Sequence, residues 1–91
     1  MSVDEYVNKI IECYNLKDYT VEYILICERA TIDEAIDFFK FDNPNKNKLD
    51  ELHSIKKFLA DNETEIKSKL LKYQQYKYGD VGLGNVRVQG M

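Results

Sequence analysis

Residues 20–41, TVEYILICERATIDEAIDFFKF, form the most apolar stretch of the chain. This stretch contains two apolar runs, 21–27 and 32–41, on either side of the short joint 29–31. The segments before and after it each have one apolar and one polar face, which is typical of elements that cover a core. We therefore expect residues 20–41 to form the centre of the fold, with the flanking segments packed against it.

The first run, 21–27, fits either a helix or a strand. It is rich in Val, Tyr and Ile, which favour strands, and a short unbroken apolar run can be a buried strand. A helix is favoured because Asp18 or Thr20 can cap it and because the run continues through Glu28, beyond the usual length of a strand. We predict a helix here, and an α+β fold with a short strand at 20–27 is the alternative.

The second run begins with a capping-box pattern, Thr31-Ile32-Asp33-Glu34, which predicts the start of a new helix. Apolar residues then recur at helical spacing to about Lys40. Pro44 ends this helix, because proline has no N–H and restricts the residue before it. Two helices joined by residues 29–31 have the outline of a helix-turn-helix, whose second helix enters the major groove of DNA.

Helices are also predicted on both sides of the central stretch. Residues 2–5, SVDE, form a capping box, and apolar residues follow it at helical spacing. After Pro44, an amphipathic helix is expected over 47–60, and the polar residues 61–64 separate it from a last helix that reaches about Tyr76. The alternative is one continuous helix, in which Asn62 is a single polar residue on the apolar side. The expected fold is all-α, a compact bundle of four or five short helices within residues 1–78.

The last thirteen residues, 79–91, differ from the rest of the chain. They contain all four glycines, which disfavour a helix, interleaved with apolar residues. We predict an extended C-terminal arm that is either flexible or laid on a partner. Its candidate partner-binding residues are Val81, Leu83, Val86 and Val88.

The charge of the chain is unevenly distributed. The net charge of the 91 residues is −3, and residues 1–41 have four bases against nine acids, whereas 42–91 have nine bases against seven acids. The two halves are weakly complementary, which favours their packing on each other or on a partner of opposite charge. The absence of concentrated positive charge argues against a general polyanion binder.

Few residues in the sequence suggest catalysis or metal binding. His53 is the only histidine, and Cys13 and Cys27 lie in apolar segments, where we expect buried, unreactive thiols. Asp33 and Asp37 have the spacing of a carboxylate pair on a helix, but a solvated acidic face explains them better than a metal site does. We therefore predict no enzymatic activity, no cofactor and no metal. With no leader pattern and no apolar run of membrane-spanning length, a cytoplasmic location is expected.

The outer side of the 31–41 segment is acidic, which indicates a surface that binds protein and not DNA. Asp33, Glu34 and Asp37 would face phosphates in a helix-turn-helix complex, with only Lys40 to offset them. We predict a small protein-binding accessory, regulatory or assembly factor that uses these three acids together with the arm. The high content of Lys, Asn, Ile and Tyr is associated with AT-rich genomes, which suggests an origin in a phage or mobile element. The expected partner is a host or virion protein. Self-association through the arm is the other possibility.

The alternative function is a nucleic-acid-binding transcriptional regulator. It rests on the helix-turn-helix outline, and on lysines interleaved with tyrosines near the end of the helical region, which can pair phosphates and stack bases. The residues of this second surface are Lys69, Lys72, Tyr73, Tyr76 and Lys77.

Overall fold

The structure is a computed structural model, which describes residues 1–79. Three α-helices pack together, α1 (Val3–Cys13), α2 (Val21–Asp37) and α3 (Lys46–Tyr78), and a π-helical turn, η1 (Phe38–Asp42), follows α2. No strand occurs within the described residues, so the all-α prediction is confirmed and the strand at 20–27 is wrong. The predicted arm, apart from Gly79, lies outside the described residues.

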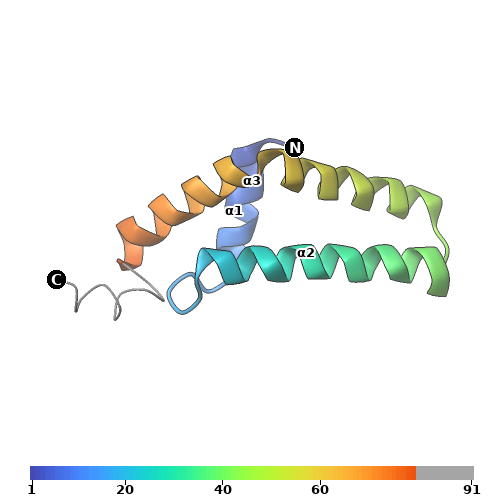
Figure 1. Ribbon diagram of the computed structural model, residues 1–91, viewed down its shortest axis with the longest axis horizontal. Coiled ribbons are helices and arrows are strands. Elements are labelled where there is room, and N and C mark those ends of the chain that lie inside the picture. Colours follow the sequence, from blue (N-terminus) through green and yellow to red (C-terminus); the bar gives the residue numbers. More distant parts are fainter. Residues whose placement is uncertain (80–91) are drawn as a thin grey trace.

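The arrangement is elongated, with extents of 53 × 24 × 20 Å. Figure 1 shows α2 and α3 running in opposite directions as a long hairpin, and α1 crossing this pair at a steep angle on the half away from η1. The prediction of a compact bundle of four or five short helices was therefore wrong in helix number and in shape. The cause is that both expected interruptions, at 29–31 and at 61–64, lie inside helices.

The starts of the helices are capped much as predicted. The Ser2 hydroxyl accepts a hydrogen bond from the Glu5 N–H at 3.1 Å, and the Ser2 N–H donates to the Glu5 carboxylate at 2.8 Å. This bond from the Ser2 N–H is the largest cause of a lowered pKa at Glu5. Thr20 caps α2 by accepting from the Tyr23 N–H at 3.1 Å. Asn45 caps α3 in the same way, directly after Pro44.

Helix α2 passes without interruption through residues 29–31, so the predicted helix-turn-helix does not exist. Thr31 lies in the middle of α2 and caps no helix start. Two physical reasons explain the continuity. The joint contains no glycine or proline, and Leu25, Ile32 and Ile36 are all buried on one side of a continuous helix.

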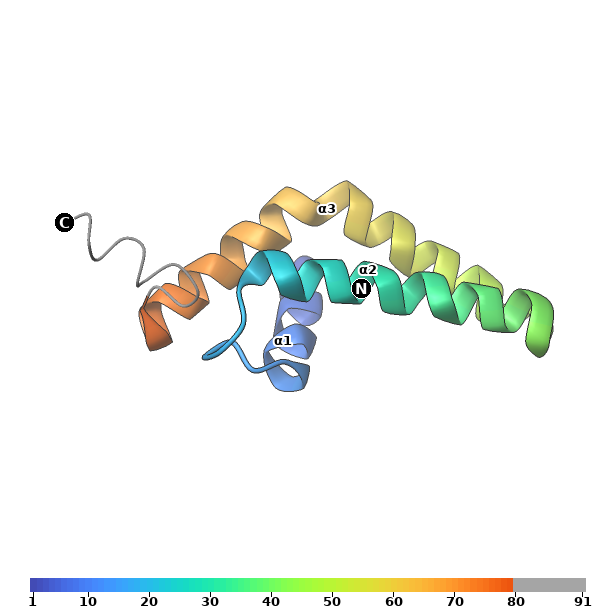
Figure 2. The same cartoon turned by 60° about the horizontal axis from the view of Figure 1, so that its bottom comes forward.

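Helix α3 is bent at Asn62, whose backbone is non-helical with φ −117° and ψ 15°. The Asn62 side-chain amide donates to the Phe58 carbonyl at 2.9 Å, which is the carbonyl that the N–H of residue 62 takes in a straight helix. The predicted break is therefore a bend within one helix of 33 residues. The bend, visible in Figure 2, lets the two halves of α3 pack along different parts of α2 and α1.

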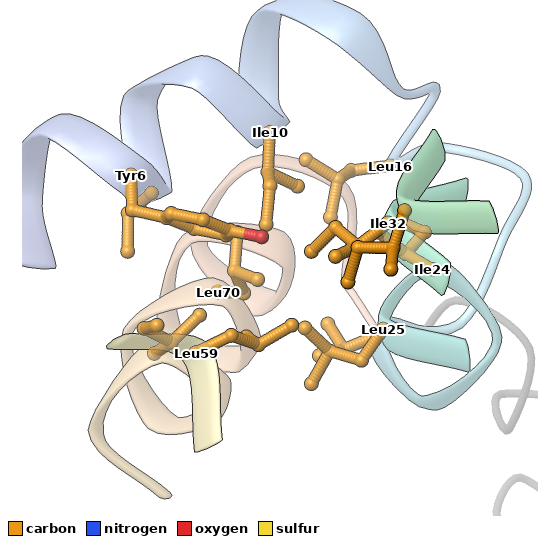
Figure 3. Close-up of a cluster of buried hydrophobic side chains, with 12 residues drawn as sticks. Tyr6, Ile10, Leu16, Ile24, Leu25, Ile32, Leu59 and Leu70 are labelled. Atoms are coloured by element: carbon orange, nitrogen blue, oxygen red, sulfur yellow. The ribbon is translucent and has the colours of Figure 1, made fainter. Parts of the chain in front are cut away.

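The apolar core lies where α1 crosses the hairpin. Figure 3 shows Tyr6, Ile10 and Leu16 pointing toward side chains of α2 and α3. The buried apolar residues are Tyr6, Val7, Ile10, Leu16, Val21, Ile24, Leu25, Ile32, Ile36, Leu59, Ile66 and Leu70. The core thus draws on all three helices and on the 14–20 loop.

Four side-chain hydrogen bonds in this region were not predicted. Gln74 on α3 is buried and donates to the carbonyls of Leu16 at 3.0 Å and Tyr19 at 2.7 Å, which fastens the 14–20 loop to α3. The Glu28 carboxylate on α2 accepts from the Tyr6 hydroxyl at 2.6 Å and from the Tyr14 hydroxyl at 2.8 Å. Burial and the bond to Glu28 raise the pKa of both tyrosines above the ordinary range.

Ion pairs between helices confirm that the two halves of the chain are complementary in charge. On α3, Lys56 pairs with Asp33 and Lys67 pairs with Glu22, both on α2. Lys69 of α3 pairs with Asp4 of α1. These pairs are at the surface, so each contributes little to stability.

Candidate protein-binding surface

The outer face of α2 points away from the core and carries two kinds of residue in succession. Its first part, called here the apolar half, consists of Tyr19, just before the helix, with Tyr23, Ile26 and Ala30. Its second part, called the acidic half, consists of Asp33, Glu34 and Asp37. All seven residues are exposed. Helical periodicity places the six residues within α2 on the side opposite to its buried residues.

The apolar half corrects in part the expectation that residues 20–41 form the centre of the fold, because two side chains of the 21–27 run face solvent. Tyr23 is 52% exposed and Ile26 is 56% exposed. The Tyr19 and Tyr23 rings stack with centroids 5.4 Å apart and an interplanar angle of 22°. The two thiols were also misplaced, because Cys13 is exposed and Cys27 is only half-buried.

The acidic half brings together the three acids that the sequence predicted as a site. Asp33 is partly neutralised, because its carboxylate lies 2.8 Å from the Lys56 ammonium across the hairpin. Glu34 and Asp37 are exposed, and neither forms an ion pair with another residue of the described part. Two carboxylates of this face are therefore free to meet a basic partner.

Next to the acidic half, at the end of the hairpin, two aromatic side chains project into solvent. Phe38 is 44% exposed and Phe41 is 69% exposed, and both belong to the π-helical turn η1. We call this pair the aromatic tip. The Lys40 ammonium lies 5.3 Å from the Phe41 ring centroid. A π turn inserts an extra residue and shifts the positions that follow, and such turns occur often at functional sites.

Sequence reasoning missed the aromatic tip because it counted both phenylalanines in the apolar central stretch. Only Phe39 of the three phenylalanines in η1 is half-buried. One signal was available in the sequence. The run Phe38-Phe39-Lys40-Phe41 is too apolar for a single inward face, so at least one ring has to point outward.

Between α2 and α3, beside Asp33, lies a small cavity of about 100 Å³. Its walls are the apolar side chains of Ile32, Leu59 and Ala60, and the ion pairs Arg29–Glu63 (3.1 Å) and Lys56–Asp33 form its rim. Pockets for small molecules usually enclose several hundred Å³. This cavity is large enough only for a side chain or a small fragment, which fits a protein contact better than a metabolite site.

The structure separates the five residues of the predicted nucleic-acid surface into two groups. Lys69 pairs with Asp4 at 3.2 Å, and Tyr73 is half-buried against the core, so both help to hold the fold. Lys72, Tyr76 and Lys77 are exposed on the last turns of α3, and Tyr76 is 88% exposed. Val81, Leu83, Val86 and Val88 of the predicted arm lie outside the described residues.

Within residues 1–79, no group of three or more His, Cys, Asp and Glu side chains is arranged to hold a metal ion. His53 is exposed on α3. None of the helices in the described part is both long and apolar enough to cross a membrane.

Comparison of the chain with models of protein families, with curated proteins and with solved structures found no match. The function has to be inferred from the surface itself.

Proposed function

We propose that this protein is a small protein-binding factor without enzymatic activity, which recognises a basic surface of its partner through the acidic half of α2 and the aromatic tip. The observation that carries this proposal is the position of the free carboxylates of Glu34 and Asp37 beside the exposed rings of Phe38 and Phe41. An apolar anchor next to complementary charge is the usual composition of a binding hot spot.

The shape of the hairpin supports this proposal. The aromatic tip is at the end of the α2–α3 pair, on the side that α1 does not cover (Figure 1). A projecting tip can enter a depression on a partner without a clash from the rest of the molecule. Phe41 supplies the apolar anchor, and the carboxylates pair with lysine or arginine at the rim of that depression.

The biological role that fits such a factor is accessory, regulatory or assembly work, in the cytoplasm of a host cell or in a virion. This part of the proposal rests on composition alone, through its similarity to that of AT-rich phages and mobile elements. The C-terminal arm is a second proposed contact, with Val81, Leu83, Val86 and Val88 as its binding residues.

The proposal is tested by affinity capture from the cell that encodes the protein, with the captured proteins identified and their binding then measured with purified components. The wild-type chain is compared with Phe41→Ser and with Asp37→Lys. We expect one specific partner whose binding each substitution weakens at least about tenfold, because an anchor or a charge pair is lost. Binding of the wild type should also weaken as salt is added.

Tyr76→Ser is the matched control, because it removes another highly exposed aromatic ring from a different surface. It should leave the partner's affinity unchanged. Equal capture by all four chains would place binding elsewhere, and a chain ending at Tyr78 would then show whether the arm is responsible. Enrichment of no protein by the wild type would overturn the proposal.

Nucleic-acid binding through Lys72, Tyr76 and Lys77 is the second candidate, because these three side chains are exposed together at the end of α3. It no longer depends on a helix-turn-helix, which α2 does not contain. Titration of single-stranded and duplex DNA at low ionic strength tests it. A salt-dependent complex that Tyr76→Ser weakens would support this candidate, and the absence of any complex would exclude it.

A further inference from the structure

The apolar half of α2 has no role in the function proposed above. Three of its four members, Tyr23, Ile26 and Ala30, span about 10 Å along the axis of α2. The fourth, Tyr19, lies just before the helix and stacks on Tyr23. In Figure 1 α2 forms the edge of the molecule opposite to α3, and this half of its outer face is exposed to solvent. An apolar stripe on the outside of a helix is typical of an interface between proteins.

We propose that the apolar half of α2 pairs two copies of this protein, with their α2 helices antiparallel about a two-fold axis. The spacing between successive members is four, three and four residues, which is the same when read in either direction. An antiparallel pair centred between Tyr23 and Ile26 therefore sets Tyr23 against Ile26 of the other copy, and the stacking of Tyr19 on Tyr23 brings Tyr19 toward Ala30 of the other copy. Such self-complementarity is the condition for a two-fold interface.

The sizes of the side chains match this arrangement. The central contact places Tyr23 of one copy on Ile26 of the other, and it occurs twice by symmetry. The outer contact places the large Tyr19 against the small Ala30 of the other copy, so a bulky residue fills the space that a small one leaves. Alternation of large and small residues across facing positions allows two helices to approach closely.

The charges on α2 select the antiparallel direction over the parallel one. In a parallel pair, Asp33, Glu34 and Asp37 would face the same acids of the other copy, which is unfavourable. In the antiparallel pair, the acidic half of each copy extends past the start of the other α2, where the exposed Lys17 and Asp18 balance each other in charge. The parallel arrangement therefore brings like charges together, and the antiparallel arrangement separates the two acidic halves.

One helix pair buries less surface than a typical stable complex, so we expect a dimer in the micromolar range. The two aromatic tips would lie at opposite ends of such a dimer and remain uncovered. This inference does not rest on the proposed function, because pairing and partner binding use different residues. Each can fail while the other holds.

The experiment is sedimentation equilibrium of the full chain over a wide range of concentration. We expect a reversible monomer–dimer equilibrium that Tyr23→Glu and Ile26→Glu each weaken at least about tenfold. Tyr76→Glu, the matched control on α3, should leave the equilibrium unchanged. Circular dichroism checks that each variant keeps its helices, which is expected because Tyr23 and Ile26 are more than half exposed.

A charge exchange within one chain tests the direction of pairing. In the double variant Tyr23→Lys with Ile26→Glu, each introduced lysine faces an introduced glutamate of the other copy if the helices are antiparallel. The double variant should then dimerise more strongly than the single variants Tyr23→Lys and Ile26→Glu, and salt should weaken it. In a parallel pair, like charges would meet and the double variant would be the weakest.

Three results would overturn the inference. The first is a wild-type chain that stays monomeric at all concentrations. The second is a dimer that Tyr23→Glu leaves intact or that Tyr76→Glu abolishes, which would place the interface on another surface. The third is loss of the dimer in Val86→Glu, which would assign self-association to the arm.

Discussion

Replacement of Glu28 by alanine should destabilise the protein more than its partly exposed position suggests. The Glu28 carboxylate accepts two hydroxyl hydrogen bonds, from Tyr6 at 2.6 Å and from Tyr14 at 2.8 Å. These bonds join α1 and the start of the following loop to α2. Tyr6 is completely buried, so its hydroxyl would have no water to replace the lost acceptor.

The expected loss of stability in Glu28→Ala follows from the energies of these two hydrogen bonds. A hydrogen bond to a charged acceptor contributes about 1.5–3 kcal/mol, and a buried donor without an acceptor costs about 1–3 kcal/mol. Tyr14 is half-buried, so its hydroxyl can bond to water instead, and loss of its bond to Glu28 costs less than loss of the Tyr6 bond. We expect Glu28→Ala to lower the free energy of unfolding by about 3 kcal/mol, which corresponds to a melting temperature lower by roughly 12–24 °C in a chain of this size. Glu28→Gln keeps one acceptor oxygen and should cost about half as much.

Thermal and urea unfolding followed by circular dichroism measure these changes, with Glu12→Ala as the control at an exposed position of α1. Glu12→Ala should change the free energy of unfolding by no more than about 0.5 kcal/mol. A double-mutant cycle with Tyr6→Phe isolates the bond itself, because the effects of Glu28→Ala and Tyr6→Phe should not add. If the two effects are additive, or if Glu28→Ala is as mild as the control, the reasoning is refuted.

Three further predictions concern the same fold. Because burial and the bond to Glu28 raise the pKa of Tyr6, its contribution to stability is complete below about pH 10 and falls above that pH by up to about 1.4 kcal/mol per pH unit. Urea unfolding between about pH 9 and pH 11.5 should show a loss of stability with rising pH, to which Tyr14 also contributes, and the slope should be smaller in Tyr6→Phe. Gln74→Leu leaves two loop carbonyls without a donor and should cost about 1–3 kcal/mol in thermal unfolding, so an unchanged melting temperature would show that the amide does not fasten the loop. Ser2→Ala should lower the free energy of unfolding by about 1 kcal/mol, because α1 loses its cap. Lys57→Ala breaks an exposed ion pair within α3 and should not change the melting temperature measurably.

Local sequence patterns predicted the features of this fold that have local causes. The cap at Ser2, the amphipathic α1 and the boundary at Pro44 all depend on residues within a few positions of one another. The same kind of pattern failed at Thr31. A capping box offers one or two hydrogen bonds to a helix start, but a continuous α2 keeps Leu25 and Ile32 on one buried side, and that burial decides the outcome.

The features that sequence reasoning missed depend on contacts between distant residues. Gln74 meets the Leu16 carbonyl across 58 positions of sequence, and Glu28 meets Tyr6 across 22. No periodic pattern of residues within one segment indicates which distant residue it will contact. The candidate site also combines features with local causes and features that depend on distant contacts. Its acids were found from their spacing on one helix, whereas the exposure of Phe41 depends on how α2 ends against α3.

The position of α1 has a consequence for how the protein opens. Because α1 covers only the half of the hairpin away from η1, the other half is held by two helices and by few buried residues, notably Ile32 and Ile36. Local unfolding costs least where buried apolar contacts are fewest, so amide hydrogens near η1 should exchange with solvent well before those around Tyr6. The end that carries the aromatic tip can then adjust to a partner while the core stays folded, and part of the free energy of binding is spent on ordering it.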